Sequence, residues 1–227
     1  MAEYRFIKSA EDAIIEKMRA DAFLKLTVRK KRIVPCQEAL LQRPQGVIIM
    51  KEIEIKILGI DRMAVETRLL SLGAKKIFDD EIHALYYDFA DSSLKNSDCA
   101  LRLRLEGMRS VLCLKKPIES KEAKIREEYE IEVSDFDTMK YLMEGLGLNA
   151  WLEMKKHRTS YEFRGVHFEI DEYHDAYNFI PTFLEIEGHD IETIYACAEL
   201  LGFRGNDCKP WDILQVVAYY SGQLQDQ

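Results

Sequence analysis

Acidic and basic residues recur at every second position in several segments of this chain. The first such segment contains Glu52, Glu54 and Lys56, with isoleucines between them. Because successive side chains of a β-strand point to opposite faces, these three charges would project from one face and the isoleucines from the other. Carboxylates bind hard divalent cations, and Lys and Arg bind phosphate oxygens. A face of this kind therefore suits an anion and a metal ion that are bound together.

The same alternation returns along the chain, where Arg102 and Arg104 alternate with leucines. The other charged positions of this pattern are Lys115, Arg126, Glu128, Glu130, Glu132, Lys156, Arg158, Glu169, Asp171, Glu185 and Glu187. Two arrangements satisfy the pattern. One is a sheet with a solvated charged face and helices on its apolar face. The other is a barrel with helices on its apolar exterior and charges lining a tunnel. The pattern alone leaves both open.

The elements that must position these charges alternate between strands and helices. Strands are predicted at 50–58, 75–89, 99–106, 109–116, 124–133, 151–163, 166–172 and 180–187. Helices are predicted between Asp61 and Gly73 and at 135–145, 190–201 and 210–220, with polar loops at 90–98 and 117–123. Most of these strands lack the long helical crossovers that parallel pairing needs. We therefore expect an antiparallel sheet of about eight strands, closed or nearly closed, with helices outside it.

Composition limits the classes of protein that fit. The 227 residues suit one domain, 50–227, with an appendage of unknown role at 1–49. The net charge is −8, and residues 50–227 carry 34 acidic against 22 basic residues, which argues against a nucleic-acid surface. We expect no membrane span and no secretion signal. The five cysteines are far apart, as is typical of a reduced, cytoplasmic protein.

In this order and spacing, the charged residues resemble the CYTH family, also called triphosphate tunnel metalloenzymes, which includes class IV adenylyl cyclases and thiamine triphosphatases. The opening ExExK of that family is matched by residues 52–56, and an RxR pair is matched by Arg102 and Arg104. The remaining matches are Lys115, Arg126, Glu128, Glu130, Lys156, Arg158, Asp171, Glu185 and Glu187. The resemblance covers about residues 50–220.

The resemblance implies an α+β fold: an eight-stranded antiparallel β-barrel tunnel with a charged interior and helices packed outside. It implies binding of a triphosphate-containing small molecule together with Mg²⁺ or Mn²⁺. The implied substrate-binding residues are Lys56, Arg102, Arg104, Lys115, Arg126, Lys156 and Arg158. The implied metal ligands are Glu52, Glu54, Glu128, Glu130, Glu185 and Glu187. The implied catalytic residues are Glu54, Lys56, Glu130 and Asp171.

Three functions remain open from the sequence. The favoured one is metal-dependent hydrolysis of tripolyphosphate or a nucleoside triphosphate, because water is always available. The second is an adenylyl cyclase that converts ATP to cyclic AMP and pyrophosphate. The third is a module that binds polyphosphate or nucleotide without turnover. The sequence does not determine the organic part of the substrate, the preferred metal or the oligomeric state, for which a homodimer is one option. Trp151 and Trp211 are interpreted as packing residues.

Overall fold

The computed structural model describes residues 48–118 and 125–223, and only the backbone of residues 48–52, 118 and 125. The predicted appendage at 1–49 thus lies almost entirely outside the described residues, and it stays a prediction. Within the described residues, no helix has both the length and the apolar character needed to cross a membrane.

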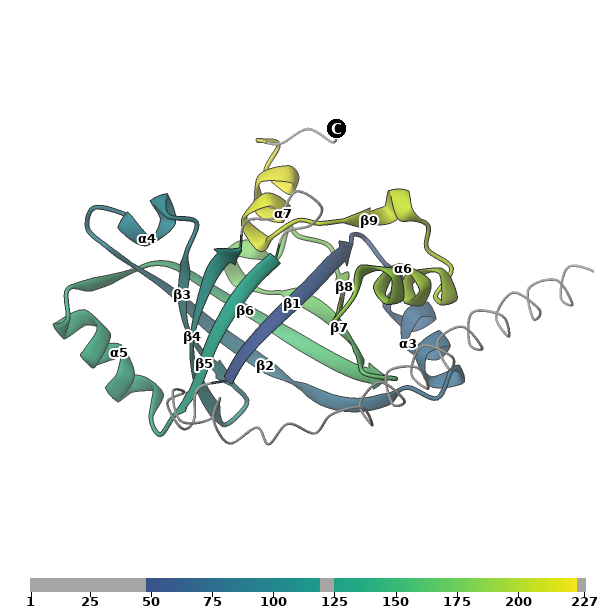
Figure 1. The fold of residues 1–227 in the computed structure, drawn as a ribbon, viewed down its shortest axis with the longest axis horizontal. Helices are drawn as coiled ribbons and strands as arrows, with labels where there is room; N and C mark the ends of the chain where they lie inside the picture. Colours follow the sequence, from purple (N-terminus) through teal and green to yellow (C-terminus); the bar gives the residue numbers. More distant parts are fainter. Residues whose placement is uncertain (1–47, 119–124, 224–227) are drawn as a thin grey trace, which may run out of the picture. The chain divides into compact units, whose positions relative to one another are not determined.

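One antiparallel sheet dominates the described residues (Figure 1). Its strands are β1 (Ile48–Ile57), β2 (Lys75–Phe89), β3 (Ala100–Glu106), β4 (Arg109–Ile118), β5 (Ile125–Val133), β6 (Leu148–Phe163), β7 (Val166–Tyr173), β8 (Phe183–Gly188) and β9 (Cys208–Lys209). Their order in the sheet is β5-β4-β3-β2-β6-β7-β8-β1-β9, with an additional pairing of β5 with β1. The eight predicted strands are therefore present, and the two-residue β9 is an addition.

The prediction of a closed eight-stranded barrel is wrong, because the sheet of the described residues has nine strands and does not close into a regular barrel. The first half of β1, residues 48–52, pairs with β5, whereas its second half, residues 53–57, pairs with β8. The end of the second half also pairs with β9 in place of β5. Because the two long neighbours of β1 use different halves of it, the nine-stranded sheet curls around an interior but is not closed along its length. The alternation of side chains does not report which strand edges meet, so the sequence could not reveal this.

Four helices of eight or ten residues are present in the described part: α3 (Arg62–Ser71), α5 (Phe136–Gly145), α6 (Ile191–Leu200) and α7 (Ile213–Tyr220). Each begins after an aspartate whose carboxylate accepts a backbone N–H of the first turn; these are Asp61, Asp135, Asp190 and Asp212. All four helices were predicted. The predicted loop at 90–98 instead contains the short helix α4 (Ser93–Asn96). The buried Asp88 accepts the backbone N–H groups of Leu94 and Lys95 and so stabilises this turn.

The two faces of the sheet differ as the alternation predicts. On the outer face, Leu85, Leu103 and Leu148 form a buried cluster with Met143 of α5. A second cluster joins Phe183 of β8, which shares the inward parity of Glu185, to Val216 of α7. The helices thus cover apolar strand residues, because burying those residues is favourable by about 25 cal/mol per Å². The rest of the inner face carries most of the charged residues.

Candidate active site

The inner face of the sheet encloses a cavity of about 870 Å³. Its lining includes most of the charged residues predicted to share one interior, namely Glu54, Lys56, Arg102, Arg104, Lys115, Arg126, Glu128, Glu130, Lys156, Arg158, Glu169, Glu185 and Glu187. Strands β1, β3, β4, β5, β6, β7 and β8 all contribute to this set. The solvated open sheet, which the alternation alone left possible, is therefore excluded.

Three predicted positions stand apart from the others. Glu132 is exposed at the end of β5 and pairs with Arg109, so the prediction that it faces the interior is wrong. Asp171 is 1% exposed and lies behind the lining, where it contacts two of the lining cations. Glu52 is described only by its backbone, which pairs with Arg126 of β5. The structure therefore leaves the metal-binding prediction for Glu52 untested.

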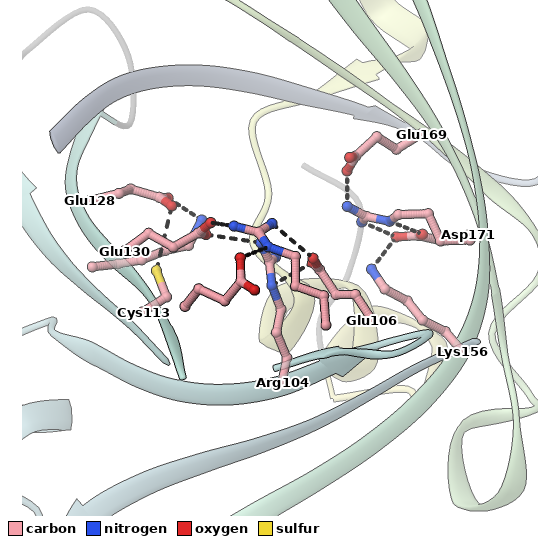
Figure 2. Close-up of polar contacts among 12 residues, drawn as sticks. Arg104, Glu106, Cys113, Glu128, Glu130, Lys156, Glu169 and Asp171 are labelled. Carbon is pink, nitrogen blue, oxygen red and sulfur yellow. Dashed lines mark hydrogen bonds and ion pairs between the residues drawn. The ribbon is translucent and has the colours of Figure 1, made fainter. Parts of the chain in front are cut away.

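Arg158 and Lys156 of β6 share the buried carboxylate of Asp171. The Arg158 guanidinium donates to Asp171 from Nε at 2.6 Å and from Nη2 at 2.7 Å, and it also contacts Glu169. Lys156 Nζ lies 2.6 Å from Asp171 Oδ2. Figure 2 shows Lys156, Glu169 and Asp171 on one side of the interior. Burial and the neighbouring Arg158 guanidinium lower the pKa of Lys156 to about 7, although Asp171 opposes the shift.

Lys56 connects β1 to β8. Its ammonium group lies 2.8 Å from Glu54 and 2.9 Å from Glu185, and its side chain is 4% exposed. Burial alone would lower the pKa of Lys56, but Glu185 and Glu54 outweigh it and raise the pKa. Lys56 therefore stays charged and holds these carboxylates in place.

The opposite side of the interior is a second ion-pair network (Figure 2). Arg104 lies 2.6 Å from Glu106 and 3.0 Å from Glu130, and Arg109 also contacts both glutamates. Next to this network, Lys115 pairs with Glu128. Glu128 and Glu130, which were predicted as metal ligands, are therefore engaged by cations in this structure.

Arg102 differs from the other arginines of the cavity. Within residues 53–117 and 126–223 it makes no ion pair with a carboxylate, and its Nε atom, like that of Arg104, has no hydrogen-bond partner. Burial and the proximity of Arg102 lower the pKa of Arg104, whereas the neighbours of Arg102, Tyr86 first among them, outweigh burial and raise the pKa of Arg102. Arg102 is half-buried and lines the cavity, so its guanidinium is available to an anion that enters it. Arg102 is therefore the position where the cavity is best prepared for an anion.

A cluster of carboxylates lies across β7 and β8. One oxygen each of Glu169, Glu185 and Glu187 lies within 4.8 Å of the others. Burial and the neighbouring Glu185 raise the pKa of Glu187, because the charged form is crowded by like charge. A divalent cation would relieve this repulsion, and carboxylate oxygens are the ligands that Mg²⁺ and Mn²⁺ prefer. The donor set thus fits the divalent ion that the resemblance implies.

The structure adds residues that sequence reasoning missed or undervalued. Glu169 was placed in the interior but not among the metal ligands, although it shares the parity of Glu185 across the β7–β8 pairing. Glu106 and Arg109 were not considered, because they flank the turn at Gly107. Trp151 lines the cavity and is 41% exposed, so its interpretation as a packing residue is wrong.

Comparison with known proteins agrees with this fold. The model of the CYTH domain matches residues 50–203. A protein of Methanocaldococcus jannaschii named "Putative adenylate cyclase" is 30% identical over 138 residues, which are 61% of this chain and 77% of that protein.

Among solved structures, a protein from Vibrio parahaemolyticus named a "putative adenylate cyclase" is 16% identical, with a TM-score of 0.63 over 74% of this chain and 97% of its own. A "Putative adenylyl cyclase" from Hippeastrum, described as having a dominant triphosphatase activity, is 20% identical. Its TM-score is 0.51, over 77% of this chain and 97% of its own. These likenesses concern the fold, whereas the match to the domain model covers more than half of the sequence. The chain belongs to the CYTH domain family.

Proposed function

We propose that this protein is a metal-dependent enzyme that hydrolyses a triphosphate and releases its terminal phosphate. One observation carries the proposal: a single cavity contains both a half-buried arginine that is in no ion pair within the described part of the chain, Arg102, and a cluster of three carboxylates. A cavity that only bound anions would gain nothing from that cluster. A cavity that only bound a metal would gain nothing from Arg102.

The residues of the chain would act mainly by positioning and by charge. Phosphoryl transfer requires little covalent chemistry from the protein, so fixed cations around the transferred group supply most of the effect. Arg102, Arg104 and Lys115 on one side would hold phosphate oxygens, with Lys156 and Arg158 on the other. Glu169, Glu185 and Glu187 would hold the Mg²⁺ or Mn²⁺ ion, whose positive charge would stabilise the transition state. Water would attack the terminal phosphorus, and the bond to the bridging oxygen would break.

A second candidate is an adenylyl cyclase, which the name of the Methanocaldococcus jannaschii relative favours. In that reaction the ribose 3′-hydroxyl attacks the α-phosphorus of ATP, and pyrophosphate leaves. The same cations would serve it, but the phosphorus that meets the nucleophile would differ. The Hippeastrum neighbour, which has a dominant triphosphatase activity under a cyclase name, supports giving hydrolysis precedence.

The test is to incubate the full chain with tripolyphosphate or with ATP, each with Mg²⁺ or Mn²⁺, and to separate the products. We expect orthophosphate from both substrates, and no release when the metal is chelated. Cyclic AMP with pyrophosphate would replace the proposal with the cyclase. Tight triphosphate binding without any metal-dependent product would refute both and support a binding module. A matched pair of variants identifies the site: Glu187→Gln should lose activity, and Glu153→Gln, on the exposed outer face of β6, should not.

A further inference from the structure

An irregularity in β6 brings a tryptophan to the cavity. In the pairing of β2 with β6, Tyr86 lies opposite Leu152 but Tyr87 lies opposite Ala150, so Trp151 is left over at a bulge. Regular alternation from Lys156 and Arg158, which face inward, would place an odd-numbered residue such as Trp151 on the outer face. A β-bulge re-aims a side chain, and bulges are frequent beside active sites. Trp151 accordingly lines the cavity.

The surroundings of Trp151 differ from the charged interior. Its ring centroid is 6.2 Å from that of Tyr86, at an interplanar angle of 57°. The ammonium group of Lys95 lies over the indole, 4.7 Å from its centroid, and so restricts the orientation of the ring. The apolar side chains of Leu101 and Leu214 line the same cavity. With 41% of its surface exposed, the indole is available to a ligand rather than committed to the core.

We propose that Trp151 and Tyr86 form the binding site for a planar heteroaromatic ring carried by the triphosphate substrate. The inference rests on the proposed function and narrows its substrate class from any triphosphate to one with an aromatic organic group, such as a nucleoside triphosphate. Stacking on aromatic side chains is favourable for every base, because each base has a π-face. It requires none of the hydrogen bonds that would recognise one base.

The position of this aromatic pair also orients the substrate. Tyr86 lies opposite Arg102 in the pairing of β2 with β3, so the ring site adjoins the arginine that has no carboxylate partner. Along β6, Trp151 is followed by Lys156 and then by Arg158, which contacts Glu169 of the carboxylate cluster. A ring bound at Trp151 therefore directs the phosphate chain past the cations towards the carboxylates. The terminal phosphate would then lie nearest the metal ligands, as hydrolysis of that phosphate requires.

Fluorescence tests the ring site without any need for turnover. The chain has two tryptophans, and the other, Trp211, is not part of the cavity lining. In the Trp211→Phe variant, Trp151 is the remaining emitter. We expect ATP to change its emission saturably and tripolyphosphate to leave it unchanged. Equal responses to the two ligands, or no response to ATP although ATP binds by calorimetry, would overturn the inference. Wild type measured beside Trp151→Phe gives the same comparison if Trp211→Phe is unstable.

A binding comparison separates this inference from the proposed function. Trp151→Leu should weaken ATP binding about tenfold, the effect of losing one stacking contact, and should leave tripolyphosphate binding unchanged. Trp211→Leu should change neither dissociation constant. If Trp151→Leu changes the dissociation constants of ATP and tripolyphosphate equally, or changes neither, the inference of a ring-binding site is wrong, even if the protein hydrolyses triphosphates. If no triphosphate is hydrolysed but the ATP-specific loss is observed, the ring site stands and the proposed function fails.

Discussion

Two arginines of the cavity should respond in opposite ways when their charge is removed. Arg158 neutralises Asp171, which is 1% exposed, through two hydrogen bonds of 2.6 and 2.7 Å. Arg102 forms no ion pair with a carboxylate of the described residues, and Glu128, the acid that helps to raise its pKa, is paired with Lys115. In Arg158→Met, a buried carboxylate therefore loses its main partner. In Arg102→Met, a half-buried cation that is in no ion pair with a described residue is replaced by an apolar side chain of similar length.

The magnitudes follow from these contacts. Breaking a buried ion pair by removing one partner costs about 3–5 kcal/mol of folding stability. Because Lys156 also contacts Asp171 at 2.6 Å, we expect Arg158→Met to fall at the lower end, near about 3 kcal/mol. Arg102→Met should leave the free energy of unfolding close to the wild-type value, because no ion pair that the structure describes is broken. It should instead weaken tripolyphosphate binding by about 1.5–3 kcal/mol, the value of a hydrogen bond to a charged group, or roughly 10–150-fold.

Urea unfolding and calorimetric titration with tripolyphosphate measure the two quantities on the same samples. Arg102→Lys is the control that keeps the charge, and it should recover part of the lost affinity. The reasoning is refuted if Arg102→Met is the destabilised variant, or if Arg158→Met unfolds at the wild-type urea concentration.

Three further predictions concern pH, metal and backbone. Because the pKa of Lys156 is lowered to about 7, its ammonium form, which favours an anion, is lost as the pH rises through 7. The dissociation constant for tripolyphosphate should therefore rise by up to about tenfold per pH unit. In Lys156→Arg this rise of the dissociation constant with pH should be smaller. Glu187→Gln should lower the metal-dependent rate by about 100-fold and shift the Mn²⁺ titration to higher concentration, whereas Glu153→Gln should match wild type. Gly107→Ala should lower the free energy of unfolding by about 1–2 kcal/mol, because residue 107 has φ +56° and the Cβ of the alanine would lie 2.5 Å from Asp80 Oδ2. A variant that unfolds at the wild-type urea midpoint would contradict this turn geometry.

Much of the fold could be predicted because its signals are local. The strand predicted at 75–89 coincides with β2 at both ends. The aspartates before α3 and α5 are visible as caps in the sequence, since each carboxylate needs only the backbone three residues further on. The short helix α4 was missed because it depends on Asp88, a buried residue outside the segment itself.

The sequence by itself determined which side chains could share an interior. A strand has a period of two, so the parity of Lys56, Arg102, Arg158 and Glu185 places each on the same face as its neighbours in the pattern. Parity cannot determine partners, because contacts across the cavity join strands that are distant in the chain. Only the tertiary structure decided that Arg158 is neutralised while Arg102 is not, that three carboxylates of β7 and β8 converge, and that a bulge turns Trp151 inward.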